Sequence, residues 1–224
     1  MYKDILKVFK INSLLDDAFN RSYEMIEVTG SMFDQVIMRL RKDQNHQYSF
    51  DVRDKDIAVN KFERQVRRDV FNHLCVSGLD DLNSGLVLVS IIIDIERIGD
   101  YTKNMVELSE NLHGVLQDTK YEEDLRRIEE AIRDSFSRVR KDFENGDAAD
   151  SQKMLNDYAW INKLCDQHVF EIINEENEKG SPGKSVALVL YFRYLKRINS
   201  HLRNIATSIV NPFHRIGFVK KKKS

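Results

Sequence analysis

The sequence predicts an all-α protein built as two tandem three-helix bundles, with six long helices in total. Three observations predict this fold. Apolar residues recur at spacings of three and four along nearly the whole chain. Two prolines and nine glycines in 224 residues leave few positions for turns, so the elements between them must be long. The helical pattern of the first half also begins again in the second, as in a tandem repeat.

The first half carries three expected helices. The first spans about residues 14–42, with Gly30 as a point of close packing against a neighbour. The second spans about residues 54–76, and the third follows Gly78 and ends near Gly114. The residues of the second helix expected to face the core are Ile57, Val59, Phe62, Val66, Val70 and Leu74.

The second half repeats this order. A fourth helix runs over about residues 125–143 and stops at Asn145-Gly146, and a fifth runs over about residues 155–172. The sixth starts at Ser181-Pro182, with Ser as cap and Pro at the first helical position, and continues to Asn211 with Val186 and Leu190 facing inward. The expected organisation is a first repeat over residues 1–116, a divergent second repeat over 117–212 and a basic tail over 213–224.

Composition limits the classes of function. Hydrophobic residues make up 42% and charged residues 32% of the chain, which is ordinary for a soluble helical protein with a sizeable core. A formal net charge of −1 gives no general attraction to nucleic acid. The N-terminus is too charged for a secretory signal, and no apolar run approaches the ~20 residues of a membrane span. Cys75 and Cys165, both expected to be buried, suit a cytoplasmic protein with reduced thiols.

The stretch from Leu86 to Glu110 carries the most information. Its first eight residues are apolar enough for a buried strand, but the apolar stripe then continues at helical spacing through Ile95, Ile98 and Met105. Glu96 and Asp100 fall on the opposite face, one turn apart. Like charges at this spacing repel each other, so they need a cation or a basic side chain nearby.

The segment Asp94–Asp100, followed by Asn104 and Glu107, resembles the third-helix signature of the PhoU-like phosphate-uptake regulators. The resemblance implies an all-helical protein of two three-helix repeats. It also implies metal clusters on the bundle surface, which the family binds through Glu/Asp-x-x-x-Asp motifs. The repeat expected from the periodicity agrees with this architecture.

The resemblance implies one set of metal ligands. Glu96 and Asp100 form one motif, and Asp56 with Asn60 forms a second at the same spacing on the preceding helix. Oxygen ligands of this kind suit Fe, Mn, Mg or Ca. Asn60 offers only a neutral carbonyl oxygen, which weakens the expected affinity.

The second repeat lacks these ligands. Shifted by one hundred positions, Lys196 stands in place of Glu96 and Ser200 in place of Asp100. If Asn162 is matched to Asn60, Tyr158 takes the place of Asp56. An ammonium group at a ligand position repels a cation. We therefore expect at most one metal site, in the first repeat.

A simpler interpretation is also open, in which Glu96 and Asp100 are a solvated helix face. Arg97 is then expected to bind a carboxylate on another helix or a partner, and Asn104 is a further candidate for partner binding. Lys220 and Lys221 belong to the basic tail. Either this tail is a solvated end, or its positive charge attracts it to an anionic membrane or to an acidic partner.

The resemblance implies a non-enzymatic, cytoplasmic regulator of phosphate uptake or phosphate signalling. Such a protein acts as an adaptor on a membrane phosphate transporter, a sensor kinase or both, and is expected to form a homodimer. Two alternatives are a metal-free helical scaffold and a di-metal carboxylate oxidase built in a helical bundle. The oxidase needs two Glu-x-x-His motifs, and the chain has only Glu110-x-x-His113.

Overall fold

The protein is all-helical, as the sequence predicts. The structure, a computed structural model, describes residues 2–77, 79–117, 119–174 and 182–219, and for residues 2–13 it describes the backbone alone. Within these residues every regular element is a helix. The elements are α1 (Tyr2–Arg41), α2 (Val52–Ser77), α3 (Leu82–Asn111), α4 (Glu122–Asn145), α5 (Ala148–Asp157), α6 (Ile161–Ile173), α7 (Pro182–Val210) and the short 3-10 helix η1 (Phe213–Arg215).

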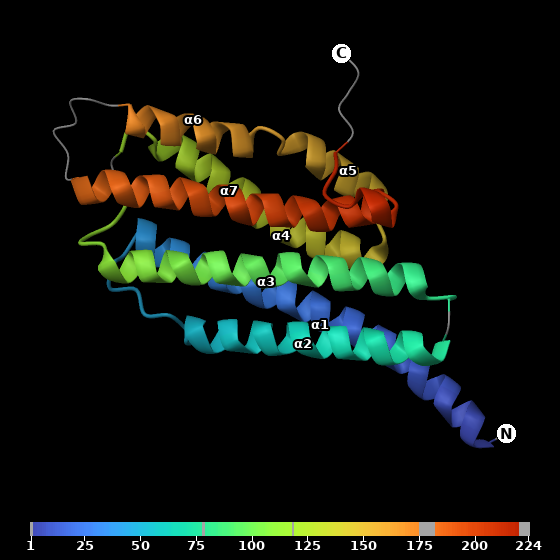
Figure 1. Cartoon of the computed structure of the whole chain (residues 1–224). Helices are drawn as coiled ribbons and strands as arrows, with labels where there is room; N and C mark the ends of the chain where they lie inside the picture. Colours follow the sequence, from blue (N-terminus) through green and yellow to red (C-terminus); the bar gives the residue numbers. More distant parts are fainter. Residues whose placement is uncertain (1, 78, 118, 175–181, 220–224) are drawn as a thin grey trace, which may run out of the picture.

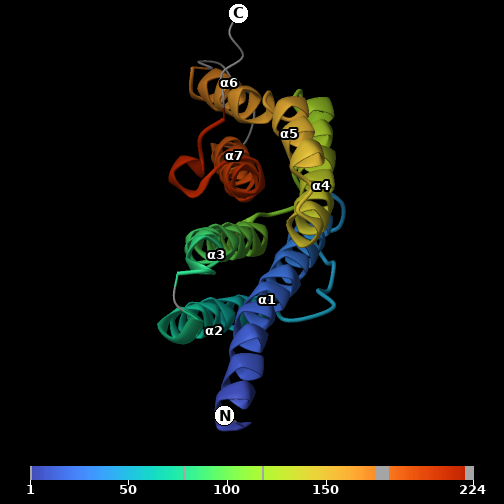
Figure 2. The ribbon, with the colours of Figure 1, turned by 90° about the vertical axis from the view of Figure 1, so that its right-hand side faces the viewer.

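The helices pack in two groups that meet along the middle of the molecule (Figure 1). Helices α1, α2 and α3 contact one another, and α4, α5 and α6 each contact α7. The two groups are joined where α3 lies against α7 and α1 against α4. Seen end-on in Figure 2, α6, α7, α3 and α2 follow one another in one layer, and α5, α4 and α1 run along one side of it.

The antiparallel pair α3 and α7 forms the central seam. The Asp94 carboxylate on α3 accepts hydrogen bonds from His201 Nδ1 (2.7 Å) and Asn204 Nδ2 (2.9 Å) on α7. Further along the seam the Tyr101 ring stacks on His201 and lies near Tyr194. Because these partners come from different halves of the chain, the seam fixes the register of one repeat against the other.

A buried ionic cluster makes a second connection between the halves. Arg41 at the end of α1 is 4% exposed, and its Nε donates to Glu129 Oε1 of α4 at 2.7 Å. The Tyr191 hydroxyl of α7 donates to the same oxygen, also at 2.7 Å, while the rest of the guanidinium binds Glu122. Burial raises the pKa of the Glu129 carboxyl, and the nearby Arg41 opposes that rise. The cluster therefore depends on Arg41 for its charge balance.

Most of the predicted inward faces are correct. The stripe expected on α3 is buried, including Ile91, Ile95, Ile98 and Met105. Gly30 of α1 packs so closely on Phe136 of α4 that an added Cβ would lie 3.3 Å from its ring. Apolar periodicity thus located most of the core.

Four predicted burials are wrong. Ile57 is 62% exposed and Val186 59%, and Leu190 and Cys75 are exposed as well. Each of these residues lies on an outward face of α2 or α7 beside the buried stripe. The spacing of apolar residues does not show which flank of the buried stripe a neighbouring helix covers.

Two helix boundaries also differ from the prediction. Helix α1 begins at Tyr2 rather than at Leu14. Residues 2–13 contain no proline or glycine that would interrupt the helix before Leu14. The predicted fifth helix is divided into α5 and α6. At the break the Tyr158 hydroxyl donates to Asp134 of α4, and Trp160 lies under the Arg127 guanidinium. The break lets both aromatic side chains reach α4.

Glycine ends α4 as predicted. Gly146 follows the helix at a φ of 67° and its N–H donates to the Asp142 carbonyl, the usual geometry of a left-handed helix end. The turn expected at Gly78 and the cap expected at Ser181 lie outside the described residues.

Candidate functional site

Helices α2 and α3 bring the predicted carboxylates together. Asp56 on α2 is only 6% exposed, because it faces α3. The Lys103 ammonium of α3 donates to Asp56 Oδ2 at 3.0 Å and lies 3.6 Å from Asp100 Oδ1. Lys103 thus bridges a carboxylate of each helix.

The sequence predicts that Arg97 binds a carboxylate on another helix, and among the described residues it binds none there. Its guanidinium donates to Asp100 Oδ2 at 2.9 Å and lies 3.5 Å from Glu96 Oε2, so it pairs with the acidic residues of its own helix. The reason is geometric, since residues three apart on a helix lie close enough to pair. The Arg97 side chain remains 53% exposed.

The acidic residues act on one another. Burial raises the pKa of Glu96, and the Asp100 carboxylate raises it further, while Arg97 lowers it. Glu63 and Asp56 of α2 also raise the pKa of Glu96. Glu63 was missed at the sequence level, although its spacing of seven from Asp56 places it on the same side of α2. We call Asp56, Glu63, Glu96 and Asp100, with Arg97 and Lys103, the carboxylate surface.

The two predicted asparagines lie at the edge of this surface. Asn60 is half-buried one turn after Asp56, and its backbone carbonyl accepts a hydrogen bond from Arg64 Nε at 3.3 Å. Asn104 is half-buried on α3, next to Lys103. Lys220 and Lys221 lie outside the described residues.

The carboxylate surface as arranged does not fit a metal ion. A cation shared by Asp56 and Asp100 would need the space that the Lys103 ammonium holds between them. In the described part of the chain, no three side chains of His, Cys, Asp or Glu are arranged so that they could hold a metal ion. The metal ligands assigned from the sequence therefore remain a prediction, and the position of Lys103 opposes it.

The second repeat has a different chemistry at the matching place. Lys196 of α7 donates to both oxygens of Asp166 of α6, at 2.7 and 2.6 Å. Beside this pair, Asn162 Nδ2 donates to Ser200 Oγ at 3.0 Å, and the buried Asn199 donates to Asn162 Oδ1 at 2.8 Å. Arg193 also lies 3.4 Å from Asp166. One acidic group with two basic partners, beside neutral amides and a hydroxyl, makes a polar helix contact rather than an acidic surface.

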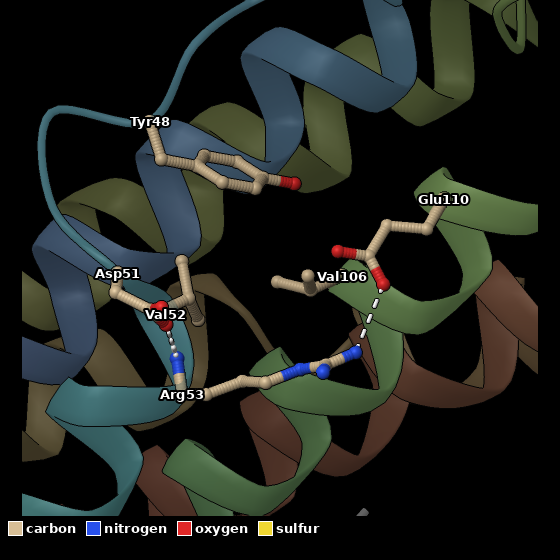
Figure 3. A pocket seen from close by; sticks show the side chains of 6 residues that line it. All are labelled: Tyr48, Asp51, Val52, Arg53, Val106 and Glu110. Atoms are coloured by element: carbon tan, nitrogen blue, oxygen red, sulfur yellow. Dashed lines mark hydrogen bonds and ion pairs between the residues drawn. The ribbon is translucent and has the colours of Figure 1, made fainter.

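A small pocket opens beside the end of α3 (Figure 3). It has a volume of about 180 Å³ and is lined by Tyr48, Asp51, Val52, Arg53, Val106 and Glu110. Figure 3 shows Arg53 extended toward Glu110. The Arg53 Nη2 and Glu110 Oε2 atoms lie 3.1 Å apart. The Tyr48 hydroxyl also has a partner, the Ser109 hydroxyl at 3.0 Å. The pocket is smaller than the ~300 Å³ of usual small-molecule sites, and two of its charged groups, Arg53 and Glu110, are paired with each other.

The Glu110-x-x-His113 motif does not face the core. Glu110 pairs with Arg53, and His113 is exposed in the segment after α3. A di-metal oxidase needs its carboxylates and histidines to point into the bundle. The arrangement therefore gives no support to the oxidase alternative.

Comparisons with known proteins give a consistent result. Residues 23–109, from α1 to α3, match the family described as the PhoU domain. The phosphate transport system regulatory protein PhoU from Streptococcus pneumoniae has a similar structure, with a TM-score of 0.77 and 16% identity over 89% of this chain and 95% of that one. PhoU from Pseudomonas aeruginosa gives a TM-score of 0.72 and 21% identity over 89% of this chain and 96% of that one. No curated protein sequence matches the chain significantly.

Proposed function

We propose that this PhoU-like protein is a non-enzymatic regulator of phosphate uptake that acts as an adaptor on a membrane phosphate transporter, a sensor kinase or both. The observation that carries the proposal is the PhoU domain at residues 23–109. The fold shared with two proteins named PhoU over most of the chain is in keeping with it.

The adaptor role rests on the kind of surface that the helices present. None of the described helices is both long and apolar enough to cross a membrane, so a membrane partner would be met from outside the bilayer. The carboxylate surface lies on two adjacent helices with Arg97 half exposed among acidic groups. Such a surface suits recognition of a charged face on a partner, because fixed charges select the orientation of binding. We place this action in the cytoplasm.

A complementation experiment tests the proposal. Cells that lack the chain should take up radiolabelled phosphate at an altered rate at high external phosphate, and the wild-type chain should restore it. Asp100→Ala, which removes a half-exposed carboxylate without touching the core, should fold but fail to restore the rate. Asp80→Ala, at an exposed position outside the carboxylate surface, is the matched control and should restore it. An unchanged rate in cells without the chain would refute the regulator role.

Two further properties belong to this proposal. We expect a homodimer, which sedimentation velocity at micromolar concentration would detect as twice the 26.3 kDa mass of one chain. The scaffold alternative predicts the same fold with no response to phosphate. Phosphate uptake that follows the presence of the chain in the complementation experiment would exclude it.

A further inference from the structure

Each repeat places a lysine of its last helix on a carboxylate of the preceding one. In the first repeat Lys103 of α3 donates to Asp56 of α2 at 3.0 Å, and in the second Lys196 of α7 donates to Asp166 of α6 at 2.6 Å. The lysines are not equivalent in the repeat, because a shift of one hundred positions relates Lys196 to Glu96 and not to Lys103. The same pairing is thus made twice from different positions.

In the first repeat the lysine has more than one acidic neighbour. The Lys103 ammonium has three donors and lies within 3.6 Å of Asp100 as well as 3.0 Å of Asp56. Asp56 is 6% exposed, and an ionised carboxylate at that depth is costly unless a charge of opposite sign accompanies it. Among the described residues, Lys103 supplies that charge from the neighbouring helix.

A bound divalent cation would compete with Lys103 for the same oxygens. Hard cations bind carboxylate oxygens at about 2.0–2.6 Å, so an ion shared by Asp56 and Asp100 would lie where the ammonium group lies. If the ammonium group and the ion both stayed beside these carboxylates, their positive charges would repel each other strongly in a partly buried site. Either the lysine or the ion can occupy the position.

We propose that Lys103 is the permanent counter-ion between Asp56 and Asp100, so that the wild-type chain holds no metal ion there, and that removing its charge creates a divalent-cation site at these two carboxylates. Lys103 is then the residue that separates a metal-free surface from a metal-binding one. The inference is independent of the proposed function, since it concerns cation binding by the isolated chain.

Isothermal titration of the chelator-stripped full chain with Mn²⁺ tests this. Lys103→Met should bind one Mn²⁺ per chain at least tenfold more tightly than the wild type, and adding Asp56→Asn to it should abolish the gain. Lys103→Arg keeps the charge and should behave as the wild type. Lys196→Met is the matched control and should gain nothing, because Asp166 keeps the Arg193 guanidinium at 3.4 Å and Lys196 bridges it to no second carboxylate among the described residues.

The melting temperature gives a second measurement on the same samples. Mn²⁺ should raise the melting temperature of Lys103→Met and leave the melting temperature of the wild type unchanged, because an ion stabilises only the folded state that binds it. If Lys103→Met does not fold by circular dichroism, Lys103→Gln takes its place. Stoichiometric Mn²⁺ binding by the stripped wild type with the affinity of the variant, or no gain in a folded variant, would overturn the inference.

Discussion

Asp94 and Asn204 lie 2.9 Å apart at the centre of the molecule, with the carboxylate of α3 accepting from the amide of α7. The two residues are 110 positions apart in the chain, so their bond connects the first half directly to the second. His201 donates to the same carboxylate oxygen at 2.7 Å. A single acidic side chain therefore has two partners across the seam.

Asp94→Ala should destabilise the protein, because it leaves the polar groups of His201 and Asn204 without their acceptor. Hydrogen bonds to a charged group are worth about 1.5–3 kcal/mol. Because His201 and Asn204 are half-buried and can bind water in the variant, we expect a net loss of roughly 2 kcal/mol for the two bonds together. For a chain of this size that lowers the melting temperature by about 4–8 °C in calorimetry. The control Asp80→Ala, at an exposed position, should melt within a degree of the wild type. Equal melting of the two variants would show that the seam does not depend on Asp94.

Arg41→Ala should be more damaging. It removes the buried guanidinium between Glu129 and Glu122 and leaves the Glu129 carboxylate uncompensated. Breaking one side of a buried pair costs about 3–5 kcal/mol, which urea unfolding would detect as a lower midpoint at an unchanged slope. Arg126→Ala, which breaks the exposed pair with Glu130, should change the free energy of unfolding by less than about 1 kcal/mol. If Arg41→Ala lowered the free energy of unfolding by as little as Arg126→Ala does, the buried ionic cluster would not stabilise the fold as described.

The two thiols should differ in reactivity. Cys75 is exposed, whereas Cys165 is buried and its pKa is raised from 9.0 to about 12 by desolvation and by the nearby Asp166. At pH 8 a disulfide-exchange reagent should therefore titrate one thiol in the folded protein and two in guanidinium. Cys75→Ser should leave none in the folded state. Rapid modification of Cys165 without denaturant would contradict its burial.

The same thiol gives a pH dependence of known sign. Because the pKa of Cys165 is higher in the folded than in the unfolded chain, its contribution to stability is fully present below pH 9.0 and is lost as the pH rises towards about 12. Cys165→Ala should make the free energy of unfolding less dependent on pH in this range, measured by urea unfolding at pH 8 and pH 10.5. An unchanged slope against pH would show that Cys165 does not titrate as described.

Gly146→Ala should destabilise the end of α4. Gly146 has a φ of 67° with open space around its Cα, so the cost of a side chain is conformational and not steric contact. A left-handed conformation costs a residue with a Cβ about 1–2 kcal/mol, which thermal unfolding would detect as a lower midpoint. Gly146→Asn should lose less, because asparagine tolerates this conformation. Equal losses for the two substitutions would point to a cause other than the backbone.

Periodicity predicted the helices because burial of one face is what stabilises a long helix in a packed protein. It could not predict the break between α5 and α6. The break depends on Tyr158 and Trp160 reaching Asp134 and Arg127, which lie on α4, more than twenty residues earlier in the chain. The exposure of Ile57 likewise depends on where α2 lies in its layer. Both are properties of the tertiary arrangement.

The sequence predicts which acidic residues lie in the candidate site, but it does not predict which basic side chains pair with them. The motif spacing correctly placed Glu96 beside Asp100, and Asp56 on the neighbouring helix. The spacing does not show that Lys103 pairs with Asp56 on α2 while Arg97 pairs with Asp100 on its own helix. Long basic side chains have several rotamers, and the choice among them depends on the carboxylates of the assembled bundle.

The chain repeats its helices but not the chemistry on them. Lys196 and Ser200 stand where the first half has Glu96 and Asp100, and they pair with Asp166 and Asn162 instead of forming a second acidic surface. The molecule is therefore monovalent for a ligand that recognises those carboxylates. Such a ligand binds in a single orientation, and two of them can be brought together only by two copies of the chain.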